Sequence, residues 1–190
     1  MDSTRDRLLD AARAILAKEG VDGISVRQVA AAAGVSPMAM YRHFADKDAL
    51  IDALMLDGLG TWEKMVAAVR TKDPIKWIER VCEAYVDFAI ADPHRFDAAF
   101  LLPARGARRY PNDFIAKPSA GIQMLFARLQ AAREGGVPLQ LPIERIAPIL
   151  SGIMQGMASL HRAGRFASDA DFRRLTKTAV RDFLMLVTNQ

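Results

Sequence analysis

Residues 25–47, which read SVRQVAAAAGVSPMAMYRHFADK, contain two short helical patterns that meet at a glycine. Ser25 can cap the first helix, and one face of that helix carries Val26, Val29, Ala30 and Ala33. Gly34 interrupts the pattern where a sharp turn needs a left-handed residue. Ser36 and Pro37 then supply a cap and a first helical residue for the second helix. The stretch therefore predicts a helix-turn-helix.

The rest of the chain has a helical period and almost no strand signal, because no stretch alternates apolar and polar residues between turn residues. Caps, prolines and glycines predict about nine helices, at residues 4–19, 26–33, 37–44, 46–69, 74–91, 93–102, 118–135, 143–163 and 169–187, the last capped by Asp169. Residues 103–117 predict an irregular loop. The expected fold is all-α, with a three-helix helix-turn-helix domain over residues 1–48. A shared helix joins this domain to a C-terminal helical bundle over residues 49–190.

Charge alone does not predict a nucleic-acid partner. The chain has a net charge of +4, but its first 50 residues carry seven basic and seven acidic side chains, which cancel. DNA binding would therefore depend on where individual charges face. The single cysteine, Cys82, excludes an intramolecular disulfide and suits a reducing cytosol, where it would pack as a small apolar side chain.

Several other classes of protein are not expected. No run approaches the roughly 18 apolar residues of a membrane span, and the charged N-terminus does not resemble a signal peptide, so we expect a cytoplasmic location and no membrane partner. The three histidines, His43, His94 and His161, are scattered. No metal-ligand spacing, glycine-rich phosphate loop or nucleophile elbow is present. We expect no enzymatic activity, no metal site and no cofactor.

The stretch VRQVAAAAGVSPMAMYRHFADKDALIDAL resembles the tetracycline-repressor (TetR) family of bacterial transcriptional regulators. The resemblance covers about residues 8–54 and rests on the R-x-V-A helix, the A-G-V-S turn, the Y-x-H-F ending and an acidic-Lys-acidic segment before Ala-Leu. It implies nine or ten helices, a homodimer built mainly on the last two, and release of DNA when a small molecule binds. The sequence departs from the family at Pro37-Met38-Ala39, where members often carry Gly or Thr, and this leaves the operator sequence open.

Ten residues are expected to contact double-stranded operator DNA. Phosphate contacts are assigned to Lys47, Tyr41, His43, Ser25 and Arg27, and base contacts to Ser36, Pro37, Met38, Ala39 and Arg42. Arg42 is the residue of this set able to grip a guanine edge at two points. Alternatives remain: Ser25 can be only a helix cap, Lys47 a solvated lysine, and Arg42 a phosphate contact.

The bundle offers candidates for an effector site and a dimer interface. Soft apolar side chains with a few polar groups suit a hydrophobic effector, and we select Trp77, Tyr85, Phe88, Phe100, Met124, Met154, Gln155, Met157 and His161. Small and apolar residues on the last two helices suit a dimer interface formed by Gly152, Gly156, Ser159, Phe172, Leu175, Ala179 and Phe183. Core packing is the alternative for the first set, and close helix approach within one subunit for the second.

The sequence thus predicts a homodimeric, ligand-responsive transcriptional repressor that binds palindromic DNA. One alternative is an activating or architectural DNA-binding member of the family whose bundle binds a protein. Another is a helical ligand-binding module whose helix-turn-helix is vestigial. The Arg105, Arg108 and Arg109 cluster is either a solvated loop or a site for an anionic effector or additional DNA contact.

Overall fold

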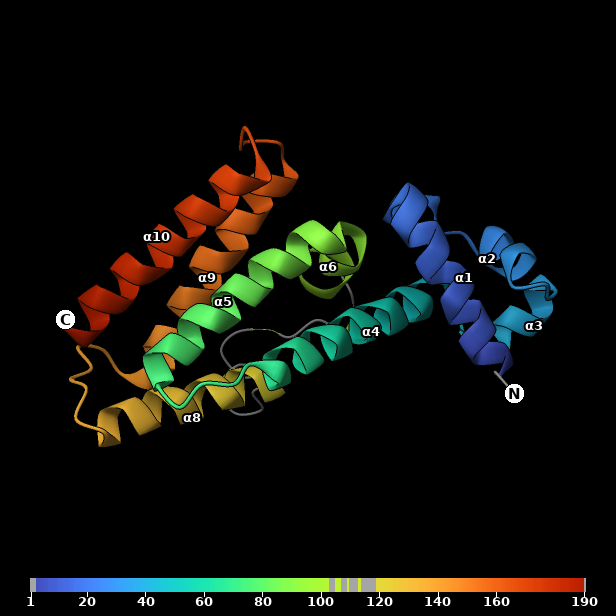
Figure 1. Cartoon of the computed structure of the whole chain (residues 1–190). Helices are drawn as coiled ribbons and strands as arrows, with labels where there is room; N and C mark the ends of the chain where they lie inside the picture. Colours follow the sequence, from blue (N-terminus) through green and yellow to red (C-terminus); the bar gives the residue numbers. More distant parts are fainter. Residues whose placement is uncertain (1–2, 103–104, 107–108, 110–112, 114–118, 190) are drawn as a thin grey trace. The chain divides into compact units, whose positions relative to one another are not determined.

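A computed structural model describes residues 3–102, 105–106, 109, 113 and 119–189. Over these residues the chain is helical and contains no strand, which confirms the predicted all-α class (Figure 1). The helices are α1 (Thr4–Glu19), α2 (Val26–Ala32), α3 (Pro37–Tyr41), α4 (Lys47–Ala68), α5 (Pro74–Ala91), α6 (Pro93–Phe100), α8 (Ala120–Glu134), α9 (Ile143–Arg162) and α10 (Asp169–Thr188), with a 3-10 turn at Val21–Gly23. None of these helices is both long and apolar enough to cross a membrane.

Local hydrogen bonds explain where most helices begin. The Ser3 hydroxyl accepts from the amide of Asp6 and opens α1, and the Ser36 hydroxyl accepts from the amide of Ala39 at 3.1 Å and opens α3. Gly34 has a φ of +68°, as the predicted turn requires. The predicted cap of the last helix was wrong by one position. Ser168 caps α10, and Asp169 is its first residue, because the Ser168 hydroxyl reaches the amide of Asp171.

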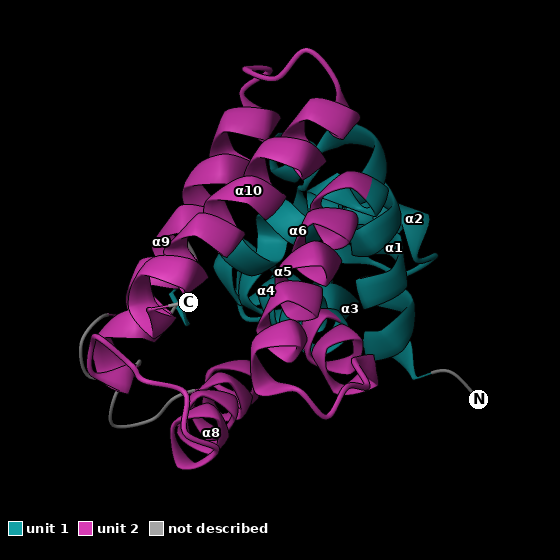
Figure 2. Ribbon diagram, turned by 60° about the vertical axis from the view of Figure 1, so that its left-hand side comes forward, with its two compact units in different colours: residues 1–61, 91–107 teal, residues 62–90, 108–190 magenta. Residues whose placement is uncertain are grey.

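The chain divides into two compact units, coloured separately in Figure 2. Unit 1 comprises residues 1–61 and 91–107, and unit 2 comprises residues 62–90 and 108–190. Unit 1 therefore extends beyond the predicted 1–48 domain. The reason is that Leu50 and Leu54 of α4 and Ala98 of α6 are buried in the same core as the helix-turn-helix residues.

The core of unit 1 fixes the helix-turn-helix from behind. Here α1 packs against α2 and α6, and α2 packs against α3. Met40 of α3 is fully buried, and Phe44, just after α3, is almost fully buried. They meet Leu8 and Ala12 of α1 and Val29 of α2 in one hydrophobic cluster. Since Met40 points inward, the neighbouring residues of this short helix point toward solvent.

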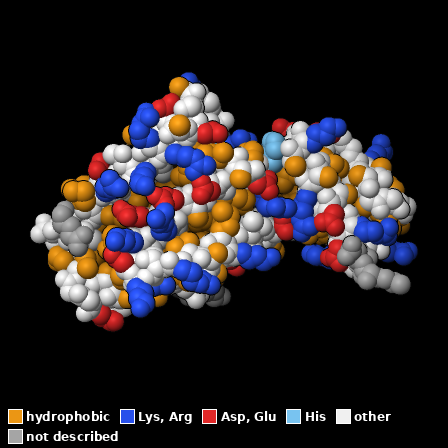
Figure 3. All heavy atoms as spheres, viewed as in Figure 1, with side chains coloured by type: hydrophobic (Ala, Val, Ile, Leu, Met, Phe, Trp, Pro, Cys, Tyr) orange, Lys and Arg blue, Asp and Glu red, His pale blue; other side chains and the backbone are white. Residues whose placement is uncertain are grey.

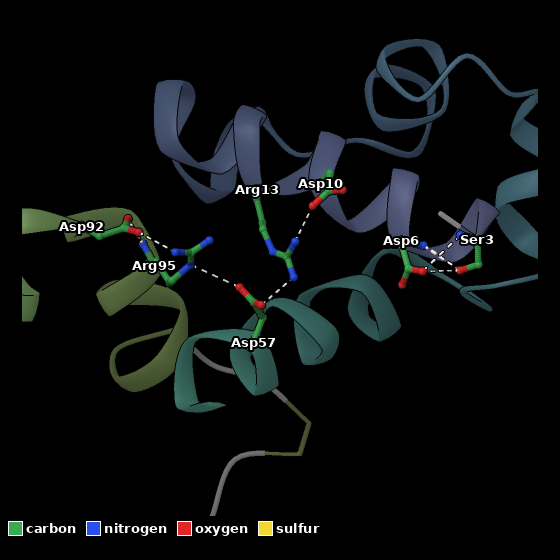
Figure 4. Close-up of polar contacts among 7 residues, drawn as sticks. All are labelled: Ser3, Asp6, Asp10, Arg13, Asp57, Asp92 and Arg95. Atoms are coloured by element: carbon green, nitrogen blue, oxygen red, sulfur yellow. Dashed lines mark hydrogen bonds and ion pairs between the residues drawn. The ribbon is translucent and has the colours of Figure 1, made fainter. Parts of the chain in front are cut away.

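A charged network also joins three helices of unit 1 (Figure 4). Asp57 of α4 lies between two arginines: its Oδ1 is 2.6 Å from Arg13 Nη2 on α1, and its Oδ2 is 3.2 Å from Arg95 Nε on α6. Arg13 also pairs with Asp10, and Arg95 with Asp92. The Asp57 side chain is only 18% exposed, so solvent screens these pairs less than it screens surface pairs.

Gly58 is required where α4 and α6 pack closely. A Cβ at this position would lie 2.8 Å from the carbonyl oxygen of Arg95 and 2.9 Å from Cβ of Ala99. We therefore expect Gly58→Ala to destabilise the protein by roughly 1–3 kcal/mol, even though alanine favours a helix. Urea unfolding at a fixed protein concentration measures the change.

The matched control for Gly58 is Gly60, which lies two residues further along α4. An added Cβ there would meet no atom within 4 Å among residues whose positions are described. Gly60→Ala should stabilise the protein by about 0.5–1 kcal/mol, because alanine loses less conformational freedom in a helix. Equal stabilisation by both substitutions would contradict the close packing of α6 on Gly58.

Unit 2 consists of the end of α4 with α5, α8, α9 and α10, and α9 packs against both α8 and α10. Its interior holds Trp77 and Phe88 of α5, Leu129 of α8 and Met154 of α9. Cys82 is also buried, as predicted, and burial raises the pKa of its thiol to about 12. The thiol therefore stays protonated and acts as a small packing group rather than as a nucleophile.

Candidate nucleic-acid interface

The helix-turn-helix presents a narrow exposed surface around α3. Met38 is 69% exposed and Tyr41 is 50% exposed, in contrast to the fully buried Met40 between them. The other predicted contact residues Arg27, Ser36, Pro37, Arg42, His43 and Lys47 are exposed, and Ser25 and Ala39 are half-buried. The predicted residues thus lie on α3, just before or after it, and at the starts of α2 and α4, and most of their side chains are exposed.

Ser25 and Ser36 differ in their remaining hydrogen-bonding capacity. The Ser25 hydroxyl accepts from the amide of Gln28 at 3.2 Å and donates to the Gln28 side-chain oxygen at 2.7 Å. Its single donor is therefore occupied, which favours a capping role over a phosphate contact. The Ser36 hydroxyl accepts from Ala39, and since it has no acceptor of its own among the described residues, it can donate to a DNA oxygen.

Charge is dispersed over the face of the molecule that Figure 3 draws. On the face drawn in Figure 3, Lys and Arg side chains alternate with Asp and Glu and do not form one continuous basic patch. Within the described residues, Arg27, Arg42 and Lys47 form no ion pair. These three exposed cations therefore remain available for an anionic partner, consistent with binding through a few placed side chains.

The start of α4 is capped by an acidic side chain. Asp46 Oδ1 accepts from the amide of Ala49 at 2.7 Å, so a carboxylate already occupies part of the helix N-terminus beside Lys47. Asp46 also forms a two-point contact with Arg105, at 2.8 and 3.3 Å. The hydrogen bond from the Ala49 amide lowers the pKa of the Asp46 carboxyl below its usual range, and the hydrogen bond and charge of Arg105 lower this pKa further.

Arg105 is a residue whose contacts the sequence did not reveal, because 59 positions separate it from Asp46. Of the predicted arginine cluster, Arg108 lies outside the described residues. Arg109 is exposed, and its amide donates to Asp113 at 2.8 Å. Arg105 and Arg109 therefore have different partners, and Arg105 forms a specific contact with α4.

The predicted effector residues are distributed over both units. Phe100 belongs to unit 1 and the other eight to unit 2. Trp77, Tyr85, Phe88 and Met154 are buried, and Met124, Gln155, Met157 and His161 are half-buried. Tyr85 packs edge-on against Trp62, with ring centroids 5.4 Å apart, and burial raises the pKa of its hydroxyl. His161 has a structural role, because its Nε2 lies 2.8 Å from Asp169 and its ring stacks on Phe172 at 4.3 Å.

Within the described part of the chain, a groove of about 250 Å³ lies between α5 and α10. Cys82, Val86, Thr176 and Val180 line its apolar part, while Glu83–Lys177 and Asp87–Arg173 ion pairs join the two helices beside it. None of the nine predicted effector residues lines this groove. Their role in an effector site therefore stays a prediction.

The predicted dimer residues separate into two groups. Gly152, Gly156 and Ser159 of α9 are exposed, and a Cβ added to either glycine would meet no atom of the described residues within 4 Å. Close helix approach within one subunit therefore does not explain these glycines. On α10, Leu175 is 51% exposed, and Ala179 and Phe183 are half-buried. Phe172 does not belong with this set, because it is fully buried against His161 and Phe166.

Two family profiles match the chain. Residues 8–54 match the profile described as "Bacterial regulatory proteins, tetR family", and residues 78–183 match "Tetracyclin repressor-like, C-terminal domain". The chain aligns at 26% identity with the transcriptional repressor AcnR of Corynebacterium efficiens, over 94% of this chain and 93% of AcnR. Shorter matches join it to the regulator YobS of Bacillus subtilis at 31% identity and UidR of Escherichia coli at 32%. These cover only 52% of YobS and 39% of UidR.

Solved structures share the fold over nearly the whole chain. A Rhodococcus sp. RHA1 protein of unknown function gives a TM-score of 0.76 at 27% identity, covering 99% of this chain and 97% of that one. The fatty acid degradation regulator FadR of Bacillus halodurans gives 0.69 at 19% identity, covering 97% and 96%. At such low identity FadR supports the fold alone. The two profiles together cover both the helix-turn-helix and most of unit 2, so the chain belongs to the TetR family of bacterial transcriptional regulators, which are not enzymes.

Proposed function

We propose that the protein is a homodimeric transcriptional repressor that binds palindromic operator DNA and releases it when a small, hydrophobic effector binds. The observation that carries the DNA-binding part is the anchoring of α3. Met40 is buried, while Met38, Tyr41 and Arg42 project into solvent. Such a helix can enter a major groove without disturbing the core behind it.

In this proposal some of the exposed residues contribute to DNA affinity and others to sequence preference. Lys47, Tyr41, His43 and Arg27 bind phosphate oxygens and fix the position of α3 on the duplex. Arg42 reads a guanine edge, and Met38 contacts a thymine methyl group. A dimer places two such helices on successive turns of one DNA face, which accounts for a palindromic operator.

A gel-shift titration against the DNA upstream of the protein's own gene tests this function. We expect a specific complex at moderate salt that survives an excess of unrelated DNA of equal length. A folded, dimeric protein that forms no complex more stable than its complex with unrelated DNA would count against the repressor. That result would favour the alternative of a helical ligand-binding module whose helix-turn-helix is vestigial.

The phosphate contact of Lys47 gives a quantitative prediction. Lys47→Ala should weaken binding to operator and unrelated DNA alike, by about tenfold at low salt, because one phosphate contact per subunit is lost. A plot of the logarithm of affinity against that of salt concentration should become shallower by about one for each subunit bound. An unchanged slope would remove Lys47 from this role.

The effector part of the proposal rests on linkage. An effector that binds more tightly to a form with low DNA affinity must weaken DNA binding. DNA in turn weakens effector binding by the same coupling free energy. The soft, buried side chains of unit 2 suit an apolar ligand, and the structural relative RolR is described in complex with the ligand resorcinol. A thermal-shift screen of apolar compounds identifies candidates, which must then release the operator complex. Compounds that stabilise the protein but leave this complex intact would not be effectors.

The proposed repressor would act in the cytoplasm, where operator DNA is accessible. Its regulated genes are best sought among its neighbours on the chromosome, beginning with the DNA used in the gel-shift titration.

A further inference from the structure

Three carboxylates surround the start of α4, next to the proposed phosphate contact Lys47. Asp46 caps the helix through the amide of Ala49, and Asp48 and Asp52 follow in the first two turns. Because the pKa of Asp46 is lowered, this carboxylate is charged at neutral pH. A DNA phosphate that approaches Lys47 would therefore meet negative charge on both sides of it in the sequence. A phosphate contact at this point needs a compensating cation.

Arg105 supplies that cation from beyond the end of α6. Its guanidinium contacts both oxygens of Asp46, at 2.8 and 3.3 Å. Its Nε lies 3.7 Å from Asp52 and 4.0 Å from Asp48. The next residue fixes the backbone, because the amide of Gly106 donates to Asp52 Oδ1 at 3.2 Å. One guanidinium thus faces three carboxylates of α4.

The same arrangement leaves Lys47 available. Asp46 and Asp48 flank Lys47 in the sequence, yet in the described part of the chain neither carboxylate pairs with it. The Asp46 carboxylate instead accepts hydrogen bonds from the Ala49 amide and the Arg105 guanidinium. Lys47 is exposed, so its ammonium can bind a phosphate without first leaving an internal partner.

We propose that Arg105 is a positioning residue for DNA binding: by neutralising the carboxylates at the start of α4, it allows Lys47 to bind a DNA phosphate. This inference rests on the proposed function. Arg105 acts through Asp46 and Asp48 and contributes no contact with a base. Its effect on affinity is therefore independent of DNA sequence, unlike that of Arg42.

Arginine-to-alanine substitutions at positions 105 and 109 provide the first test. Arg105→Ala should weaken binding to operator and unrelated DNA by a similar factor, about 3- to 10-fold at low salt, because repulsion at the contacted phosphate rises. Arg109→Ala removes the same charge from an exposed residue four positions away, and should change affinity by less than about twofold. Equal affinities of wild type and Arg105→Ala would overturn the proposal.

The decisive variant is Arg105→Ala combined with Asp46→Asn. Asparagine caps helices as well as aspartate does but carries no charge, so the double variant should recover the affinity of the wild type to within about twofold. Failure of this rescue would overturn the proposal, since Arg105 would then act by touching DNA itself or by holding its own chain segment. Circular dichroism and sedimentation must show the same fold and dimer for each variant.

Asp46→Asn alone keeps the test open if Arg105→Ala does not fold. This variant should bind operator DNA at least as tightly as the wild type at low salt, and weaker binding would contradict the proposed repulsion. A wild-type protein with no specific operator complex would refute the proposed function. A normal wild-type complex combined with unaltered binding by Arg105→Ala would refute only the role of Arg105.

Discussion

Replacing Gly156 with leucine should convert the proposed dimer into a folded monomer. Gly156 is exposed on α9, and a Cβ there meets no atom within 4 Å in the part of the chain that the structure describes, so the single chain tolerates a larger side chain. Leucine also favours a helix over glycine by about 1 kcal/mol. In a symmetric interface the new side chain enters twice, and we expect dimerisation to weaken by at least about 100-fold, or roughly 3 kcal/mol.

Sedimentation velocity at several concentrations measures this effect, and DNA affinity should fall with the dimer fraction. Gly60→Leu is the matched control, because Gly60 lies within α4 and has equally open space around its Cβ position. This control should remain dimeric. A Gly156→Leu dimer that persists at nanomolar concentration would place the interface elsewhere.

The basis for this interface is the pattern of exposure on the last two helices. Leu160 of α9 is 48% exposed, and Leu175 and Leu186 of α10 are 51% and 76% exposed. Leu160 follows Gly156 by one turn of α9, and an exposed apolar side chain next to an open glycine suits contact with another helix. A second copy of the chain is therefore the partner that we propose for this surface.

Replacing Arg42 should change which DNA sequence is bound. Arg42 is exposed at the end of α3 and pairs with no acid among the described residues. Loss of a two-point contact with guanine should reduce discrimination at one base pair of each half-site by about 1–3 kcal/mol in Arg42→Ala. Affinities for operators substituted at each position in turn measure this loss.

Arg42→Lys separates charge from geometry, because lysine retains the charge but lacks the planar fork of arginine. This variant should keep the salt dependence of the wild type while losing the preference at the same base pair. Arg27→Ala, in contrast, should weaken all sequences alike. If Arg42→Ala also weakens all sequences alike, Arg42 binds phosphate rather than a base.

The helix-turn-helix could be predicted well because its signals act over a few residues. Ser36 caps α3 through an amide only three positions away, and the φ of Gly34 follows from the turn between two helices. The error at α10 was also local: Ser168 and Asp169 are both good caps, and sequence alone does not rank adjacent candidates.

Residues of the bundle were harder to assign because a helical repeat does not say what each face meets. Phe172 and Leu175 are three positions apart and were grouped together, yet Phe172 is buried in the core and Leu175 is exposed. Gly58, Gly60 and Gly156 are all helical glycines, and only the packing around them shows that Gly58 touches another helix. The same limit left the predicted effector residues without a defined cavity.

By itself, the sequence determined the all-α class, the helix-turn-helix and the family, since caps, turns and amphipathic faces depend on neighbours within about four residues. The tertiary structure alone decided which charges remain available near the DNA-binding surface. Asp46 and Arg105 are 59 positions apart, and only folding brings that arginine to the carboxylate beside Lys47. Acidic and basic residues balance within the first 50 residues. Arg105, which lies outside them, pairs with Asp46, and Lys47 stays exposed.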